Sequence, residues 1–153
     1  MAITPNDSFT VGQVLTAQEC NNFPFGICAY TEPAATATFT TEQVLITTSS
    51  FTAIANRYYE LTYFGPNMSN TVGGAVTAIR FRLTNLAGAI LGESYNTFST
   101  AVGGEAVTAT RVKTLTAGAT VIVVTAQAIS GTGTSYVDTN NKPYLLIKDI
   151  GPS

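Results

Sequence analysis

The sequence predicts a single all-β domain of the jelly-roll or sandwich type, preceded by a short arm. The first supporting observation is that only 10% of the 153 residues are charged, against roughly 25% in an ordinary soluble domain. The second is that Thr is the most abundant residue, and its β-branched side chain suits a pleated surface. The third is a series of short strand-like segments separated by Gly, Pro and Asn at nearly regular intervals. This spacing is typical of antiparallel sheets with tight turns.

Residues 1–24 form the predicted arm. Residues 1–15 are polar with a few apolar side chains and are expected to be extended. Residues 16–19 (TAQE) match a capping box, in which the side chains at the two ends bind each other's backbone amides at a helix start. One or two helical turns are therefore expected to reach Asn21 or Asn22, before Pro24 ends them.

Residues 25–153 form the predicted β-sandwich. Its clearest strand covers 75–84, where apolar and polar residues alternate from Ile79 to Thr84, so that one face is buried and the other solvated. The expected strands cover 25–30, the region around 39, 44–48, 57–64, 75–84, 89–93, 106–115, 119–129 and 144–150. Short strands with almost no helix require two packed sheets or a barrel, and an eight-stranded jelly roll fits best.

Turns are expected where the strand patterns stop. Gly65-Pro66-Asn67 is expected to close strand 57–64, and the stretches 67–74 and 94–104 are candidates for contact-making loops. Residues 130–135 (SGTGTS) lack the Lys and the following helix of a phosphate-binding loop, so a flexible inter-strand loop is expected. The run 121–124 (VIVV) is apolar on both faces, which predicts a central strand or one covered by another subunit.

The sequence lacks the patterns of catalytic and metal sites. It contains no His, which excludes Ser-His-Asp and Cys-His arrangements and histidine metal sites. Cys20 and Cys28 cannot complete an ordinary zinc site and are expected to be small buried thiols, although a disulfide is geometrically possible. A carbohydrate-active enzyme would need two carboxylates facing each other in a cleft, and no local motif suggests such a pair. We therefore expect no enzyme activity, no cofactor and no metal.

The distribution of charge and hydropathy argues against two kinds of partner. The seven Lys and Arg residues are scattered, whereas nucleic-acid binding needs clustered cations. Arg80 and Arg82, on one face of their strand, are expected to form a solvated face or an intersubunit salt bridge. No run approaches the roughly 18 to 20 apolar residues of a transmembrane helix, and residues 1–7 lack a signal-peptide core. We expect synthesis in the host cytosol and no binding to nucleic acid or membrane.

One group of aromatic residues is a candidate for contacts. It consists of Tyr58, Tyr59, Tyr63 and Phe64. These side chains either line a carbohydrate site or pack in the core and at an interface, as aromatics on strands more often do. A net charge of only −2 leaves little repulsion between copies, which favours self-association.

Two segments of the chain resemble a known family. Residues 15–30 (LTAQECNNFPFGICAY) are similar to a stretch that precedes a β-sandwich in phage virion proteins, and residues 143–153 (PYLLIKDIGPS) are similar to the ending of the same proteins. The FRL strand at 81–83 and the SGTGT loop fit as well, so the resemblance covers about residue 14 to the end. The family consists of small structural proteins of tailed phages, described as head decoration (cement) or minor tail proteins. Cys20 and Cys28 depart from the Leu and Val-like residues usual in the family.

The resemblance implies a fold and a function. The fold is a jelly roll like the trimeric domains of the tumour-necrosis-factor type. The function is that of a trimeric capsid decoration protein, which binds the major capsid protein and other copies of itself on the virion surface and stabilises the head. The arm would lie on the capsid or on a neighbouring subunit through Phe9, Val11, Val14, Leu15 and Phe23. The alternative is a minor tail or fibre protein that contacts the host surface, through carbohydrate binding by aromatics and loops.

Overall fold

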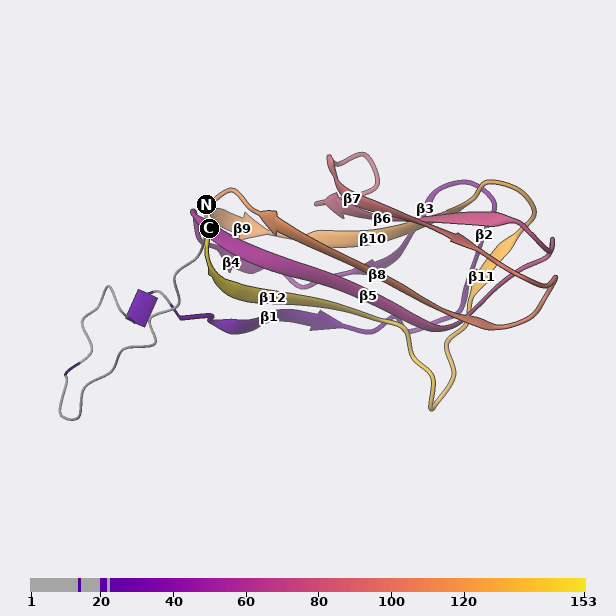
Figure 1. Ribbon diagram of the computed structural model, residues 1–153, viewed down its shortest axis with the longest axis horizontal. Coiled ribbons are helices and arrows are strands. Elements are labelled where there is room, and N and C mark those ends of the chain that lie inside the picture. Colours follow the sequence, from indigo (N-terminus) through magenta and orange to yellow (C-terminus); the bar gives the residue numbers. More distant parts are fainter. Residues whose placement is uncertain (1–13, 15–19, 22) are drawn as a thin grey trace.

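The computed structural model describes Val14, Cys20, Asn21 and residues 23–153. These residues form twelve β-strands, and the predicted all-β jelly-roll class is confirmed (Figure 1). The strands are β1 (Gly26–Thr31), β2 (Ala37–Phe39), β3 (Gln43–Thr47), β4 (Phe51–Ala53), β5 (Arg57–Asn70), β6 (Val76–Leu83), β7 (Ile90–Thr97), β8 (Glu105–Thr114), β9 (Gly118–Thr120), β10 (Ile122–Ala128), β11 (Gly133–Ser135) and β12 (Tyr144–Pro152).

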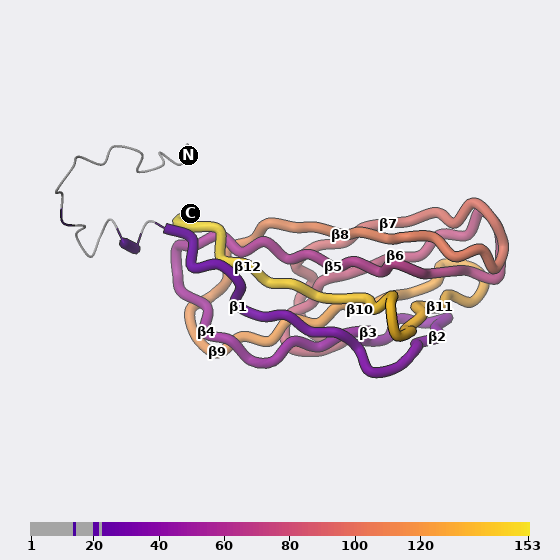
Figure 2. The backbone as a smooth tube through the Cα atoms, turned by 90° about the horizontal axis from the view of Figure 1, so that it is seen from below, coloured from indigo at the N-terminus to yellow at the C-terminus, as the bar shows by residue number. Residues whose placement is uncertain are grey.

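The strands form two large sheets and a small one. Sheet A has the order β1-β12-β5-β11-β2, and β8 pairs with the other side of β5. Sheet B has the order β3-β10-β6-β7, and β4 pairs with β9. We call the end where β1 begins and β12 ends the proximal end. The connections β5–β6, β7–β8 and β10–β11 lie at the opposite, distal end (Figures 1 and 2).

The hydrophobic core lies between sheets A and B. In β5 the inward residues Tyr59, Leu61 and Tyr63 are at most 1% exposed, and the residues between them point outward. Ile79 and Phe81 of β6 fill the same core from sheet B. Burial of each such side chain stabilises the fold by about 1.5–3 kcal/mol, so the alternation in sequence fixes which face of each strand is covered.

Strand β5 does not end at Gly65-Pro66-Asn67, as the sequence predicted. It continues to Asn70, and its pairing with β8 shifts register between Gly65 and Met68. A β-bulge accommodates Pro66 because Pro has no amide hydrogen for the ladder. Gly65 is needed there, since an added Cβ would lie 2.6 Å from the Tyr63 hydroxyl. The extra length lets β5 pair with β12 in its first part and with β11 in its last.

Three other expectations about strands are corrected. The stretch 94–104 is not one loop, because β7 continues to Thr97. Residues 133–135 are not part of a flexible loop but form β11 between β5 and β2. The expected strand 119–129 divides into β9 and β10 around Val121. Strand β10 lies between β3 and β6, which confirms the prediction of a central strand, and its apolar residues are covered by the chain itself.

The arm meets the sandwich just before β1. Cys20 and Asn21 have helical backbone conformation, whereas the predicted capping box, Thr16 to Glu19, lies outside the described residues. Both cysteines are free, with Cys20 exposed and Cys28 half-buried. The expectation of two buried thiols is therefore wrong for Cys20, because this residue precedes the first strand and lies outside the core.

Candidate interaction surface

The outer face of sheet A carries large apolar side chains that no other part of the described chain covers. We call this surface the aromatic face. Its apolar members come from four adjacent strands, β1, β5, β8 and β12, and they are Ile27, Tyr30, Tyr58, Phe64, Val112, Tyr144 and Leu146. Ile27 is 66% exposed and Tyr30 is 52% exposed. Exposed apolar side chains are ordinary when scattered, but neighbouring ones on one face mark an interaction site.

Strand register brings three rings of this face together. Tyr144 of β12 is the Cα partner of Phe64 in β5, and their ring centroids are 5.6 Å apart. On the other side, the ring of Tyr30 lies 5.6 Å from that of Tyr144. These separations are in the range of favourable aromatic pairs. The three rings therefore form a continuous row across β1, β12 and β5.

The polar groups on the aromatic face leave it without net charge. Lys148 and Glu60 are paired across β12 and β5, with 3.8 Å between Nζ and Oε1. Both side chains are at least one third exposed, so this pair contributes little to stability. Thr62 and Thr110 lie opposite each other in β5 and β8, with their hydroxyl oxygens 3.4 Å apart.

The centre of the outer face of sheet B has a different character, because ion-paired side chains of the chain itself cover it, whereas Ile90 and Tyr95 on the edge strand β7 stay exposed. Arg82 donates two hydrogen bonds to Glu42, at 2.7 and 2.8 Å. The Thr125 hydroxyl donates to the same carboxylate, and Arg80 lies 3.1 Å from it. Hydrogen bonds from Arg82 hold the pKa of the Glu42 carboxyl below its usual value, against the opposing effect of burial.

Arg80 extends this ionic network along sheet B. Its Nε donates to Glu93 of β7, and its Nη1 donates to Gln127 of β10 at 2.8 Å. Under these side chains Val123 is only 1% exposed, although it points away from the core. The expectation of a simple solvated face for Arg80 and Arg82 is therefore corrected, because both side chains are largely buried in ion pairs within the chain. The alternative of an intersubunit salt bridge stays a prediction.

Charge is distributed unevenly between the arm and the sandwich. The first Lys or Arg in the sequence is Arg57, and the arm carries two of the nine acidic residues, Asp7 and Glu19. Residues 25–153 therefore hold seven acidic and seven basic residues and are formally neutral. Copies of the sandwich experience no net electrostatic repulsion.

The predicted contact residues of the arm are only partly described. Val14 is 86% exposed and Phe23 is 36% exposed, whereas Phe9, Val11 and Leu15 lie outside the described residues. Exposure of the two described side chains is compatible with contact to a partner. The assignment of these five residues stays a prediction.

The predicted aromatic group splits between two environments. Tyr59 and Tyr63 are core residues, and burial raises the pKa of Tyr63 to about 12. Tyr58 and Phe64 belong to the aromatic face. Sequence reasoning missed Tyr144, which joins Phe64 only through the pairing of β12 with β5. Residues 144–147 are all apolar, so no local alternation could have placed Tyr144 on an outer face.

Among the described residues, no group of three or more His, Cys, Asp and Glu side chains is arranged to hold a metal ion. Within the same residues, no helix has the length and apolar character required to cross a membrane.

Comparison with known proteins supports the fold. No protein-family model matches the sequence, and no curated protein matches it either. Among solved structures, the Eiger TNF of S. frugiperda is similar, with a TM-score of 0.52 and 7% identity over 84% of this chain and 94% of that one. A structure of Bacillus endospore appendages, described as disulfide-linked pili, has a TM-score of 0.40 and 15% identity over 92% of this chain and all of that one.

A structure of the infectious bursal disease virus Gx strain is also similar. Its TM-score is 0.40, with 14% identity over 81% of this chain and 36% of that one. The similarity to Eiger TNF extends over most of both chains, and the described strands form the packed antiparallel sheets of a jelly roll. The chain therefore has a jelly-roll fold like that of tumour necrosis factor.

Proposed function

We propose that this chain is a structural protein of phage virions, a capsid decoration protein that binds the outside of the head as a trimer and stabilises it. The observation that carries the proposal is the aromatic face. It is largely apolar and has no net charge, and it lies on a sandwich whose opposite face carries the chain's own ion pairs at its centre.

Association of copies through the aromatic face follows from its chemistry. Tyr and Phe are enriched in the centres of protein interfaces, where burial of their rings contributes most of the binding energy. Here Tyr30, Tyr144 and Phe64 form such a centre. Glu60 and Lys148 neutralise each other within the face, so two copies can approach without like-charge repulsion. Closed symmetric oligomers are the common result of such contacts.

The arm supplies the second contact, to the major capsid protein. Val14 and Phe23 are exposed on the part of the arm that is described. An extended segment adds contact area and is ordered at the expense of conformational entropy only when it binds. In this proposal the trimer and its three arms bridge neighbouring capsid subunits, and the protein has no catalytic role and no nucleic-acid or membrane partner.

Cryo-electron microscopy of whole virions from the phage that encodes the chain tests this proposal. We expect density of the size and shape of the sandwich on the outer surface of the head, with threefold symmetry. Purified protein is expected to bind empty expanded heads in a co-sedimentation assay. A head surface without such density, or purified protein that stays in the supernatant, would contradict the proposal.

A second candidate function is that of a minor tail or fibre protein that binds host carbohydrate. The favouring observation is again the row of Tyr30, Tyr144 and Phe64, because exposed aromatic rings stack on sugar rings. The two functions differ in what covers the row. In the decoration trimer it is buried between copies, whereas a sugar-binding protein keeps it open. Binding to a glycan array that is lost in Tyr144→Ala, together with tail density in virions, would favour this second candidate.

A further inference from the structure

An ion pair at the proximal end of the sandwich connects the first residue of β5 with the end of β12. Arg57 and Asp149 are both buried, with 5% and 1% of their side chains exposed. The guanidinium donates from Nε to Oδ2 at 2.5 Å and from Nη2 to Oδ1 at 2.7 Å. This two-pronged geometry is the strongest that Arg and a carboxylate form.

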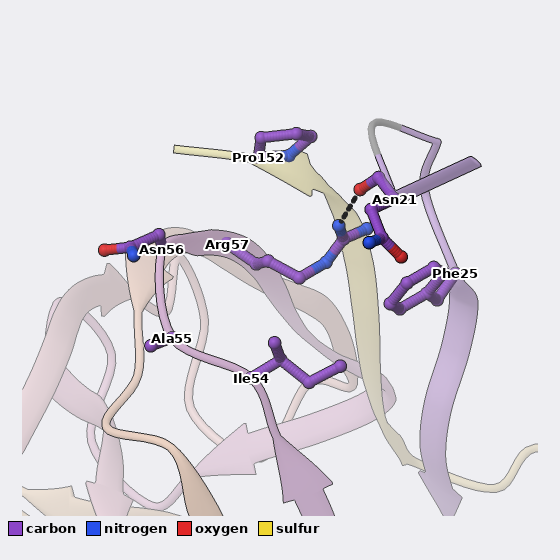
Figure 3. Close-up of a pocket in the computed structure, with 7 residues that line it drawn as sticks. All are labelled: Asn21, Phe25, Ile54, Ala55, Asn56, Arg57 and Pro152. Carbon is purple, nitrogen blue, oxygen red and sulfur yellow. Dashed lines mark hydrogen bonds between the residues drawn. The ribbon is translucent and has the colours of Figure 1, made fainter. Parts of the chain in front are cut away.

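The same guanidinium also holds the segment that leads into β1. Nη1 of Arg57 donates to the carbonyl of Asn21 at 2.5 Å, and Nη2 donates to the carbonyl of Phe23 at 2.5 Å. Its carbon centre lies 3.8 Å above the ring of Phe25. Figure 3 shows the Arg57 side chain extending toward Asn21 and the Phe25 ring. We call Asn21 and residues 23–25 the arm root.

Asp149 binds the arm root from the other side. Its Oδ1 accepts the amide hydrogen of Phe25 at 3.3 Å and that of Gly151 at 3.0 Å. The second bond requires the register shift between Asp149 and Gly151 in β12. Gly151 adopts a φ of +118° there, which only Gly adopts without strain. The DIGP motif at 149–152, part of the resemblance noted above, therefore builds the acceptor side of this site.

A buried ion pair is a weak source of stability, because desolvation of two charges offsets most of their attraction. Two apolar residues would fill the same space at least as favourably. They could not, however, hold two carbonyls and one amide of another segment in fixed positions. The chemistry of Arg57 and Asp149 is therefore suited to positioning a backbone rather than to stabilising the core.

We propose that Arg57 and Asp149 form a clamp for the arm root, which makes the arm leave the sandwich at one defined place and direction. Arg57 is a positioning residue in this proposal, because it acts on the particle only through the arm. The inference rests on the proposed function in one respect, namely that the arm contacts the capsid.

The clamp holds the arm root of its own chain. Only Pro24 and Phe25 separate Phe23 from β1, and β1 pairs with β12 of the same sandwich from Gly26 onward. Two residues span at most about 7 Å, so a Phe23 carbonyl bound to Arg57 cannot come from a distant copy unless β1 itself is exchanged. A cavity of about 260 Å³ lies beside the clamp and is lined by Ile54, Asn56 and Pro152 among others.

The test uses the full chain and the variant Arg57→Lys. Lys keeps the positive charge but lacks the planar fork that binds the carboxylate and two carbonyls together. The direct measurement is hydrogen exchange at the amide of Phe25, which donates to Asp149. Loss of charge-assisted hydrogen bonds is expected to speed this exchange about tenfold or more. Exchange at Leu61, in the centre of β5, is expected to be unchanged.

Two matched variants serve as controls. Arg80→Lys makes the same substitution in the ion pairs of sheet B and is expected to leave Phe25 exchange unchanged. Phe25→Ala removes the ring below the guanidinium without altering the buried ion pair. It is expected to speed exchange at the amide of residue 25 by about threefold, consistent with a cation–π contact. Faster hydrogen exchange at the Leu61 amide would show that Arg57→Lys fails to fold. In that case Phe25→Ala alone tests whether the clamp exists.

Binding of the protein to empty heads distinguishes a failure of the clamp proposal from a failure of the proposed function. If wild-type protein binds and Arg57→Lys binds about tenfold more weakly while remaining trimeric, the clamp positions the arm for the capsid. If the amide of residue 25 exchanges at the wild-type rate in both Arg57→Lys and Phe25→Ala, no clamp exists. Faster exchange with undiminished head binding would overturn the positioning role. If wild-type protein does not bind heads, the proposed function fails, and the exchange data alone still decide whether Arg57 and Asp149 hold the arm root.

Discussion

The outer faces of the two sheets are built on the same strand geometry but have opposite chemistry. Arg80, Arg82 and Glu42 cover the centre of sheet B, so that the outward Val123 is buried and only the edge strand β7 keeps large apolar side chains such as Tyr95 exposed. Sheet A leaves Tyr30 and its neighbouring rings in solvent. The difference teaches that the outward side chains of a sheet can be covered by the same chain or left exposed for a partner to cover. Only the second arrangement favours assembly.

The largest expected effect is on association through the aromatic face. Tyr144→Asp places a charge in the middle of the aromatic row, and each aromatic anchor at an interface contributes about 2 kcal/mol or more. We expect the proposed trimer to dissociate at micromolar concentration, as measured by sedimentation velocity. Tyr95→Asp is the matched control, because Tyr95 on β7 of sheet B is 60% exposed and lies away from that row. A trimer that survives Tyr144→Asp would show that copies associate elsewhere.

The next effect tests the ionic cover of sheet B. Glu42→Gln leaves Arg80 and Arg82 without their shared carboxylate, and breaking such a partly buried network is expected to lower the free energy of unfolding by about 2 kcal/mol. Urea denaturation measures it. Glu60→Gln removes the exposed pair on sheet A and is expected to change stability by less than about 0.5 kcal/mol. Equal losses in the two variants would mean that the faces do not differ energetically.

Acid is expected to affect Glu42 and Asp149, the two carboxylates that lie in the most buried ion pairs of the described residues. The pKa of Glu42 lies below its ordinary value of 4.5. Burial alone would raise the pKa of Asp149, but hydrogen bonds from Arg57, Phe25 and Gly151 bring it below 3.8. Such groups contribute stability above their unfolded-state pKa, and the contribution is lost as pH falls through the folded-state value.

Urea midpoints measured from pH 7 to pH 3 are therefore expected to stay level down to about pH 5 and then to fall. In Glu42→Gln the fall is expected to be shallower, because one of the groups that takes up protons is missing. If the urea midpoint of Glu42→Gln falls with pH as steeply as that of wild type, Glu42 does not contribute to the loss of stability in acid.

The smallest effect concerns salt. The sandwich is formally neutral and the aromatic face pairs Glu60 with Lys148. Dissolved salt therefore has few charge interactions between copies to screen. The trimer dissociation constant is expected to change by less than about threefold between 0.05 and 1 M NaCl. Analytical ultracentrifugation measures this. A change of a hundredfold would indicate an interface held by charges rather than rings.

The sequence predicted the fold class and several strands because alternation is a local signal. It placed β6 correctly and predicted the central position of β10, because Ile79 to Leu83 alternate and residues 122–124 are all apolar. It merged β9 with β10, because no local signal marks the break at Val121. It ended β5 too early, because the bulge that accommodates Pro66 depends on pairing with β8. A turn motif and a bulge contain the same residues, and only tertiary pairing distinguishes them.

The candidate surface was less accessible to sequence reasoning. Phe64 was identified as an aromatic candidate, but Tyr30 and Tyr144 reach it from distant parts of the chain through register. The clamp was not foreseen at all, because Arg57 and Asp149 are separated by 92 positions. Pairings of this kind follow from strand order, which local patterns do not determine.

The separation of the proximal and distal ends has a practical consequence for display of foreign peptides. Strand β5 spans the sandwich with 14 residues, or about 45 Å. The β5–β6 connection at the distal end contains Gly73 and Gly74, and Gly74 has a φ of +76° with no neighbouring atom near its missing Cβ. A peptide inserted between these two glycines would be presented a full strand length from the arm root, on the side of the protein that faces away from the clamp.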